Sequence, residues 1–225
     1  MGTPLNKDRW RHEIGPWPFN AERQIYTDST DNIALDGNGN LVITARKNAT
    51  GGYTSARVDT RSSFSTAYGR FEARMKLPKG QGLWPAFWLL GADYIESGWP
   101  KCGEIDIMES AGDQPNKITS ALHGPGYSGG NPILKPYRTS GKTFADDFHV
   151  FAVEWEPEVI RFFVDETLHQ SITVDDVTQR GRWVYDHPFY VILNLAVGGS
   201  YPGNPDENTV FPQSLTVDYV RVFQH

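Results

Sequence analysis

Features that would place this 225-residue sequence in several common protein classes are scarce or absent. Cys102 is the only cysteine, so no disulfide can form within the chain and cysteine pairing says nothing about the redox compartment. Its neighbours Lys101 and Gly103 offer no catalytic partner, which favours a structural role over a nucleophilic thiol. No apolar run approaches the length of a membrane span. The sequence therefore resembles neither a disulfide-rich scaffold nor a helical membrane protein.

Basic charge is also in short supply, and the formal net charge is -6. This charge disfavours nucleic acid and anionic membranes as partners, and weakly disfavours a heavily sulfated polysaccharide. The first ten residues lack a signal-peptide pattern, as expected of a cytoplasmic protein or of a secreted one whose signal peptide lies outside this sequence. Aromatic residues make up 13% of the chain, which suits sugar binding but also suits a packed β-sandwich.

No segment shows a sustained helical period, and no internal repeat, linker or low-complexity stretch is present. Short alternating segments separated by Gly, Pro, Asn and Asp recur along the whole chain instead. At this length they predict a single all-β domain over residues 1–225, built as a two-sheet antiparallel β-sandwich.

Individual segments support the sandwich. Residues 36–39 (Asp-Gly-Asn-Gly) predict a hairpin turn before a strand at Leu41–Ala45, and Phe71–Leu77 alternates apolar with charged residues, as in an outer sheet. Residues 144–148 suggest a single helical turn, and residues 175–180 a short exposed turn. Three more uniformly apolar runs predict central strands: Leu83–Leu90, Val159–Val164 and Phe189–Val197.

The most informative segment is residues 103–110, Gly-Glu-Ile-Asp-Ile-Met-Glu-Ser. If its two isoleucines face a core, strand alternation sends Glu104 and Asp106 to the opposite face, where their like charges raise at least one pKa. Glu109 would fall on the wrong face unless one extra residue near Met108 forms a β-bulge. We predict that bulge, which brings all three carboxyls to one face.

Paired carboxyls on one face suit the hydrolysis of glycosidic bonds. A separation of roughly 5 to 5.5 Å between two carboxyls gives retention through a covalent intermediate. Glu104 and Glu109 would come this close only on a curved strand, so we expect a concave sheet. The alternative is an ordinary solvated strand face that carries scattered acids.

Indole side chains are the second candidate feature. Alternation in Leu83–Leu90 places Trp84 and Trp88 on one face and Phe87 with Leu89 on the other. Two indoles projecting from a sheet would form a platform for pyranose rings, although they would be core residues if that face were buried. Trp99 lies in a loop just before the acidic segment, which favours sugar stacking over a core position.

His123 ends the segment Ile118–His123, which is a candidate hairpin partner of the acidic strand. There it would bond to Asp106 or Glu104 and help to set their ionisation, although a lone histidine is also commonly structural. The six histidines are scattered without metal-ligand spacing, and no Gly-x-Ser-x-Gly elbow is present. Metal catalysis and serine-based hydrolysis are therefore disfavoured.

The motif Trp99-Pro-x-Cys-Gly-Glu-Ile-Asp-Ile-Met-Glu109 closely resembles the signature of glycoside hydrolase family sixteen, specifically its bulge-containing branch of laminarinase-like endo-β-1,3-glucanases. Four further segments match the family in order and together cover most of the chain: Tyr68-Gly-Arg-Phe-Glu-Ala-Arg, Gly82-Leu-Trp-Pro-Ala-Phe-Trp-Leu, Leu193-Asn-Leu-Ala-Val-Gly-Gly and Val217-Asp-Tyr-Val-Arg-Val.

The resemblance implies a β-jelly-roll with a long concave cleft and retaining hydrolysis of β-1,3-glucan that needs no cofactor. It implies Glu104 as nucleophile, Glu109 as general acid/base, Asp106 as the assisting acid and His123 as a member of the catalytic network. It also implies that the protein is secreted, and we expect a monomer.

By the same match, further residues look like contacts to sugar on the non-reducing side of the cut: Asn20, Arg57, Trp84, Trp88 and Trp99. Many relatives carry a calcium ion on the convex side, and the matching positions are Glu13, Gly39 and Asp218. Relatives normally open with an additional strand before the segment that matches residues 10–13, and this sequence departs from the family pattern there.

Three alternatives remain open at this point. A non-catalytic glucan-binding module would need the aromatic residues but no acid pair. Relatives specialised for mixed-linkage β-1,3-1,4-glucan generally lack the extra residue, so the insertion at Met108 favours the laminarinase branch. Relatives that act on galactans such as agar or carrageenan carry the insertion as well, so the motif does not exclude them.

Overall fold

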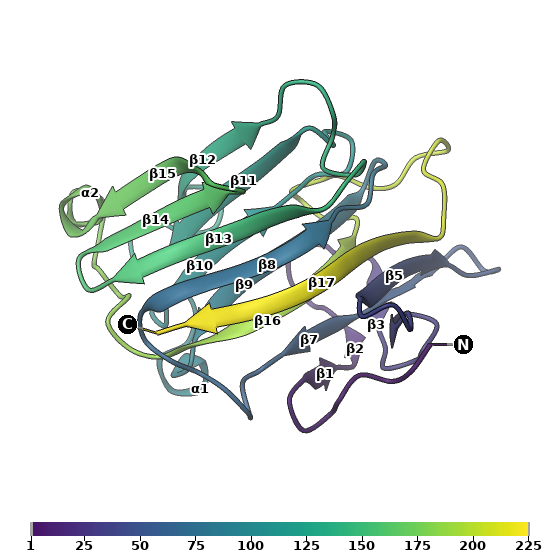
Figure 1. The fold of residues 1–225 in the computed structure, drawn as a ribbon, viewed down its shortest axis with the longest axis horizontal. Helices are drawn as coiled ribbons and strands as arrows, with labels where there is room; N and C mark the ends of the chain where they lie inside the picture. The colour runs from purple at the N-terminus through teal and green to yellow at the C-terminus, as the bar shows by residue number, and fades with distance from the viewer. Residues whose placement is uncertain (1, 225) are drawn as a thin grey trace.

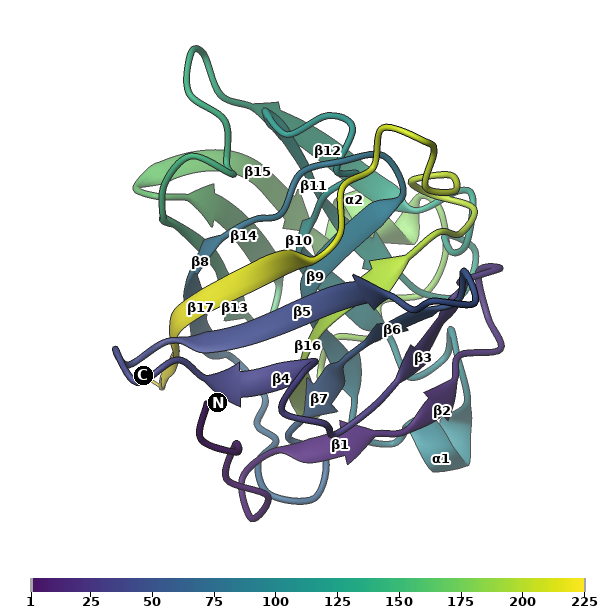
Figure 2. The ribbon, with the colours of Figure 1, turned by 90° about the vertical axis from the view of Figure 1, so that its right-hand side faces the viewer.

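The predicted strands form over nearly the whole chain in the computed structural model, which describes residues 2–224. They make two sheets that lie face to face (Figures 1 and 2). The seven-stranded sheet has, in spatial order, β1 (Arg11–Glu13), β7 (Arg57–Asp59), β16 (Phe189–Val197), β9 (Leu83–Gly91), β10 (Glu104–Glu109), β11 (Lys117–His123) and β12 (Ile133–Arg138).

The ten-stranded sheet covers one side of the first. In spatial order it has β15 (Thr167–Thr173), β14 (Val159–Val164), β13 (His149–Glu156), β8 (Gly69–Lys76), β17 (Gln213–Phe223), β5 (Leu41–Lys47), β6 (Tyr53–Ser55), β3 (Gln24–Tyr26) and β2 (Gly15–Pro16), with β4 (Ile33–Leu35) paired to β5. The all-β, two-sheet jelly roll is thereby confirmed. One pairing departs from the antiparallel prediction, since β3 and β6 run parallel after the chain reverses twice through β4 and β5.

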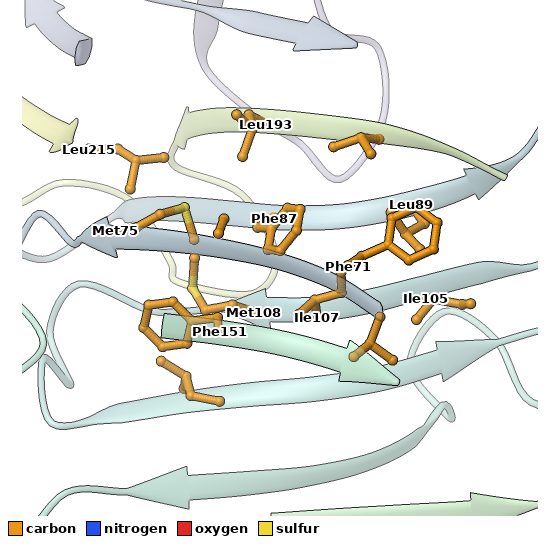
Figure 3. Close-up of a cluster of buried hydrophobic side chains, with 14 of the residues drawn as sticks. Phe71, Met75, Phe87, Leu89, Ile105, Ile107, Met108, Phe151, Leu193 and Leu215 are labelled. Atoms are coloured by element: carbon orange, nitrogen blue, oxygen red, sulfur yellow. The ribbon is translucent and has the colours of Figure 1, made fainter. Parts of the chain in front are cut away.

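A continuous apolar interior lies between the sheets. The alternation predicted for Phe71–Leu77 holds, because its apolar residues are all buried while Arg70 and Arg74 stay half-buried on the outer face. Figure 3 shows the centre of this interior, with side chains from both sheets: Phe71, Met75, Phe87, Leu89, Ile105, Ile107, Met108, Phe151, Leu193 and Leu215.

Two of the three apolar runs are central strands, as predicted, and one is not. β9 and β16 lie side by side in the middle of the seven-stranded sheet, and β16 is buried along its whole length. β14 lies only one strand from the edge and alternates between buried and half-buried residues. Its apolar composition is explained by a partly covered outer face, where Phe163 packs under the guanidinium of Arg70.

Helical structure is limited to α1 (Tyr94–Ser97) and α2 (Val174–Thr178) in the described chain. The first was not predicted, and the second replaces part of the exposed turn expected at 175–180, because Thr173 and Asp176 form a capping box. The helical turn suggested at 144–148 is wrong. That segment is a turn in which the Asp146 N–H bonds to the Thr143 carbonyl and Phe144 is buried in the core. Neither helix is long and apolar enough to cross a membrane.

The sheet faces can be tested with two leucines of the seven-stranded sheet. Leu193 of β16 is fully buried, whereas Leu134 of β12 is 50% exposed. We expect Leu193→Ala to lower the free energy of unfolding by about 2–5 kcal/mol, because it leaves a cavity, and Leu134→Ala to change it by less than about 0.5 kcal/mol. Chemical denaturation followed by tryptophan fluorescence measures both, and equal losses would contradict the assignment of the faces.

Candidate active site

The acidic strand β10 carries one residue more than its neighbour β9 between Asp106 and Glu109. Ile107 and Met108 are consecutive, yet both turn into the apolar interior (Figure 3). The following residue therefore returns to the opposite face, and Glu109 lies on the same side of the sheet as Glu104 and Asp106. The predicted β-bulge is confirmed.

The face that carries these carboxyls also carries other polar residues. Asp106, Arg57 and Asn194 come from three different strands, point away from the core and are still at least nine-tenths buried. Neighbouring side chains cover these polar groups; Trp88, for example, stacks on Arg57 and donates its N–H to Asn194. We call this polar face of the seven-stranded sheet the cleft.

Burial controls the ionisation of the acids. It raises the pKa of Asp106 to about 8. Burial and then the charge of Asp106 raise the pKa of Glu109 to about 8, against the lowering effects of His123 and of a hydrogen bond from Trp84. The pKa of Glu104 rises in the same direction for the same two causes. The carboxyls therefore titrate as a coupled group that retains protons near neutral pH, as a proton donor must.

His123 lies where the hairpin interpretation of the sequence places it. It ends β11 directly opposite Glu104. Its Nε2 is 3.1 Å from Asp106 Oδ2 and 3.7 Å from Glu104 Oε1, so it contacts two of the three acids. The hydroxyl of Tyr185 donates to its backbone carbonyl at 2.9 Å and fixes the end of the strand. The structure thus brings His123 into the carboxyl cluster.

The three predicted tryptophans also reach the cleft, and each donates its indole N–H to a polar side chain there. Trp84 donates to Glu109 at 2.9 Å, Trp99 to Glu104 at 3.1 Å, and Trp88 to Asn194 at 2.8 Å. As expected, Trp84 and Trp88 lie outside the apolar interior between the sheets, although Trp88 packs against a second, smaller buried cluster that contains Leu90 and Ile192. Trp99 is 44% exposed, so part of this residue remains accessible to a ligand.

Arg57 and Asn20 lie further along the cleft, beyond Trp88 and Trp84. The guanidinium of Arg57 lies between two indoles, 4.0 Å from the ring centre of Trp17 and 4.7 Å from that of Trp88. Asn20 is exposed, with a φ of 58°, and its side-chain amide donates to Glu22 at 3.3 Å. Both predicted residues therefore lie beside the aromatic platform.

Several cleft residues were not found from the sequence. Trp17 and Glu22 are joined to the predicted set only through contacts with Arg57 and Asn20, and no local pattern marks them. Tyr201 packs against Trp84 at 5.2 Å between ring centres, from a loop distant in sequence. Asn194 had a usable signal, because it is a polar residue within the apolar run Phe189–Val197.

Metal binding was tested against the donor atoms present. Among residues 2–224, the cluster of three acidic or imidazole side chains close enough to hold an ion is Glu104, Asp106 and His123. A cation bound there would occupy the carboxylate that the reaction needs. It would therefore compete with substrate and contribute nothing to hydrolysis by the carboxyls.

The predicted calcium ligands come from distant parts of the chain. Glu13 lies on β1 of the seven-stranded sheet and Asp218 on β17 of the other sheet. Each carboxylate already accepts a hydrogen bond from an arginine, Arg11 for Glu13 and Arg74 for Asp218, both at 2.8 Å. Gly39 could offer only its backbone carbonyl, and calcium binding at these three positions stays a prediction.

Carboxyls that share one face of a strand and accept hydrogen bonds from indole rings suit the chemistry of a glycoside hydrolase. The family model for glycosyl hydrolases family 16 matches residues 20–221. The chain belongs to this family.

Relatives and solved structures agree with that assignment. The chain is 40% identical to a beta-glucanase of Rhodothermus marinus over 99% of its own length and 81% of the relative. It superposes on the laminarinase catalytic domain of Thermotoga maritima with a TM-score of 0.93 at 43% identity, covering 98% of this chain and 93% of the other. It superposes on the endo-beta-1,3-glucanase of Pyrococcus furiosus with a TM-score of 0.92 at 46% identity, covering 98% of this chain and 90% of the other.

The raised pKa of Glu109 has a consequence for stability. The folded chain holds this proton up to pH about 8, whereas an unfolded chain releases it near 4.5, so folding stability falls as the pH rises through that window. We expect Glu109→Gln to remove this loss and to raise Tm at pH 8 by about 2–4 °C, on the order of 1 kcal/mol, with little gain at pH 4.5. Calorimetry over this range measures the effect.

The exposed Glu207 provides the matched control. Glu207→Gln removes the same charge from the surface and should leave the pH dependence of Tm as in the parent chain. A Glu109→Gln gain that does not grow with pH would contradict the burial of this carboxyl in its protonated form.

Proposed function

We propose that this chain is an endo-acting hydrolase of β-1,3-linked glucan that retains anomeric configuration by double displacement. The observation that carries the proposal is the bulge in β10, which places Glu109 on the same face of one strand as Glu104, with Asp106 between them. The family membership supports hydrolysis of a glycosidic bond, and the names of the three relatives above support a β-glucan substrate.

The roles of the two glutamates are those that the family resemblance implies. Glu104, which lies 3.7 Å from Nε2 of His123 and accepts a hydrogen bond from Trp99, attacks the anomeric carbon in its ionised form. Protonated Glu109 donates its proton to the departing glycosidic oxygen, which breaks the bond to the leaving sugar. Glu109 then takes a proton from water, whose oxygen attacks the anomeric carbon and releases Glu104. The scheme uses only these side chains and water.

Asp106 and the indoles support the reaction. Asp106 contacts His123 and adds negative potential that keeps Glu109 protonated. The exposed ring of Trp99 and the rings around Arg57 offer apolar faces for the C–H faces of glucose units. The polymeric nature of the substrate supports a secreted protein, and the expected monomer has a complete set of acids within one chain.

Each glutamate should be indispensable. We expect Glu109→Gln to lower kcat on laminarin by about 10²- to 10⁴-fold, because an amide cannot donate the proton, and Glu104→Gln to abolish turnover. Both variants should keep the circular dichroism of the parent chain, and Glu207→Gln should keep its activity. Full activity of either cleft variant would refute the assignment, and so would an inverted anomer in NMR of the fresh product.

Substrate choice is decided by product profiles on laminarin, barley mixed-linkage glucan, agarose and carrageenan. We expect laminarin to be cut first into a ladder of oligosaccharides, as endo action requires. Faster cleavage of a galactan would favour the galactan alternative. Binding of laminarin without any release of reducing sugar would favour a non-catalytic glucan-binding module.

A further inference from the structure

A short chain of hydrogen bonds crosses the apolar interior from one sheet to the other. Ser120 of β11 is fully buried, and its hydroxyl lies 2.7 Å from the carbonyl oxygen of Ile107. The same hydroxyl lies 3.1 Å from Nε2 of His169, which comes from β15 of the ten-stranded sheet. Because a carbonyl only accepts, Ser120 donates to Ile107, and His169 must donate its Nε2 proton to Ser120.

Both ends of this chain lie at β-bulges. Ser120 is the single residue of β11 opposite the two bulged residues of β10, and Ile107 is the residue that has no register partner on either neighbouring strand. In β15, Leu168 and Gln170 pair with consecutive residues of β14, so His169 is the extra residue there. This second bulge turns His169 inward beside the buried Gln170.

The burial of these polar groups needs a physical reason, because an apolar pair would fill the same space at lower cost. Burial lowers the pKa of His169 to about 4, so the imidazole is neutral at ordinary pH and no ion pair compensates. Ser120 donates a hydrogen bond to the carbonyl of Ile107, which has no register partner on either neighbouring strand because of the bulge. Such a buried carbonyl would otherwise lack a partner.

We propose that Ser120, held by His169, is a positioning residue that pins the β10 bulge and thereby aims Glu109 into the cleft. The inference rests on the proposed function, since it concerns the same proton donor. Neither side chain touches the cleft: Ser120 faces the interior, while its neighbours Thr119 and Ala121 are opposite Glu109 and Asp106. Both act through the backbone of Ile107 alone.

Kinetics on laminarin test the proposal. We expect Ser120→Ala to lower kcat about 10- to 100-fold through misplacement of Glu109, with KM within twofold of the parent because the sugar-binding side chains are untouched. His169→Phe should cause a smaller loss, about three- to tenfold, since Ser120 can still donate. The double variant should be no slower than Ser120→Ala, because His169 acts only through the serine.

Two controls separate positioning from general weakening of the core. Ser55→Ala removes another fully buried serine hydroxyl, one without a partner, and Ile43→Val trims a fully buried side chain of β5. Both should keep kcat within twofold. A Ser120→Ala variant with kcat within twofold of the parent, or additive losses in the double variant, would overturn the proposal. If Ser120→Ala does not fold, His169→Phe alone decides it by the same kcat criterion.

Crystal structures keep this inference distinct from the proposed function. In the Ser120→Ala structure we expect the Glu109 carboxyl to leave its hydrogen bond with the Trp84 N–H, while Glu104 keeps its place. An unchanged Glu109 would overturn the positioning role even if the parent chain cleaves laminarin. A parent chain that leaves laminarin intact would overturn the function, and the position of Glu109 would still decide the inference.

Discussion

The extra residue in β10 is the constraint on which the cleft depends. A regular strand separates residues at odd spacing onto opposite faces, so Glu104 and Glu109 share a groove only because Ile107 and Met108 both enter the interior. The register on either side of the bulge is regular, and it determines which residues of the neighbouring strands lie opposite each glutamate. His123 meets Glu104 before the bulge, and the small Ala86 lies opposite Glu109 after it, which leaves space beside the proton donor.

The cost of the site is electrostatic, and the sandwich offsets it. Three carboxyls with few water contacts lose hydration and repel one another, which is why their pKa values rise together. Such a group lowers the stability of the fold as the pH rises toward 8. The apolar layer behind the carboxyls is continuous between the two sheets. Its burial stabilises the fold enough to offset the desolvation and mutual repulsion of these groups. Catalytic competence and folding stability thus oppose each other at the same strand.

Much of this arrangement follows from the sequence, and the limits are physical. Period-two patterns revealed the strands and the outward direction of Trp84 and Trp88, and the odd spacing of two glutamates revealed the bulge. Contacts between distant segments were not predictable, because the stacking of Trp17 on Arg57 depends on sheet order. Burial of β14 was overestimated for a related reason, since an apolar run does not say whether a neighbouring strand covers it. The hydrogen bond between Ser120 and His169 depends on two bulges, one in each sheet, that face each other across the interior. No local sequence pattern reveals this arrangement.

The indoles connect binding to acid–base chemistry. The N–H of Trp84 favours the ionised form of Glu109, whereas burial and Asp106 favour the protonated form, so the carboxyl is poised between the two. Glu104 and Glu109 also repel as like charges. In the proposed double displacement, Glu104 becomes bonded to sugar and its charge disappears, while the Trp84 hydrogen bond stays. The balance at Glu109 then moves toward the ionised form, and the side chain that began as an acid is ready to act as the base for the second displacement.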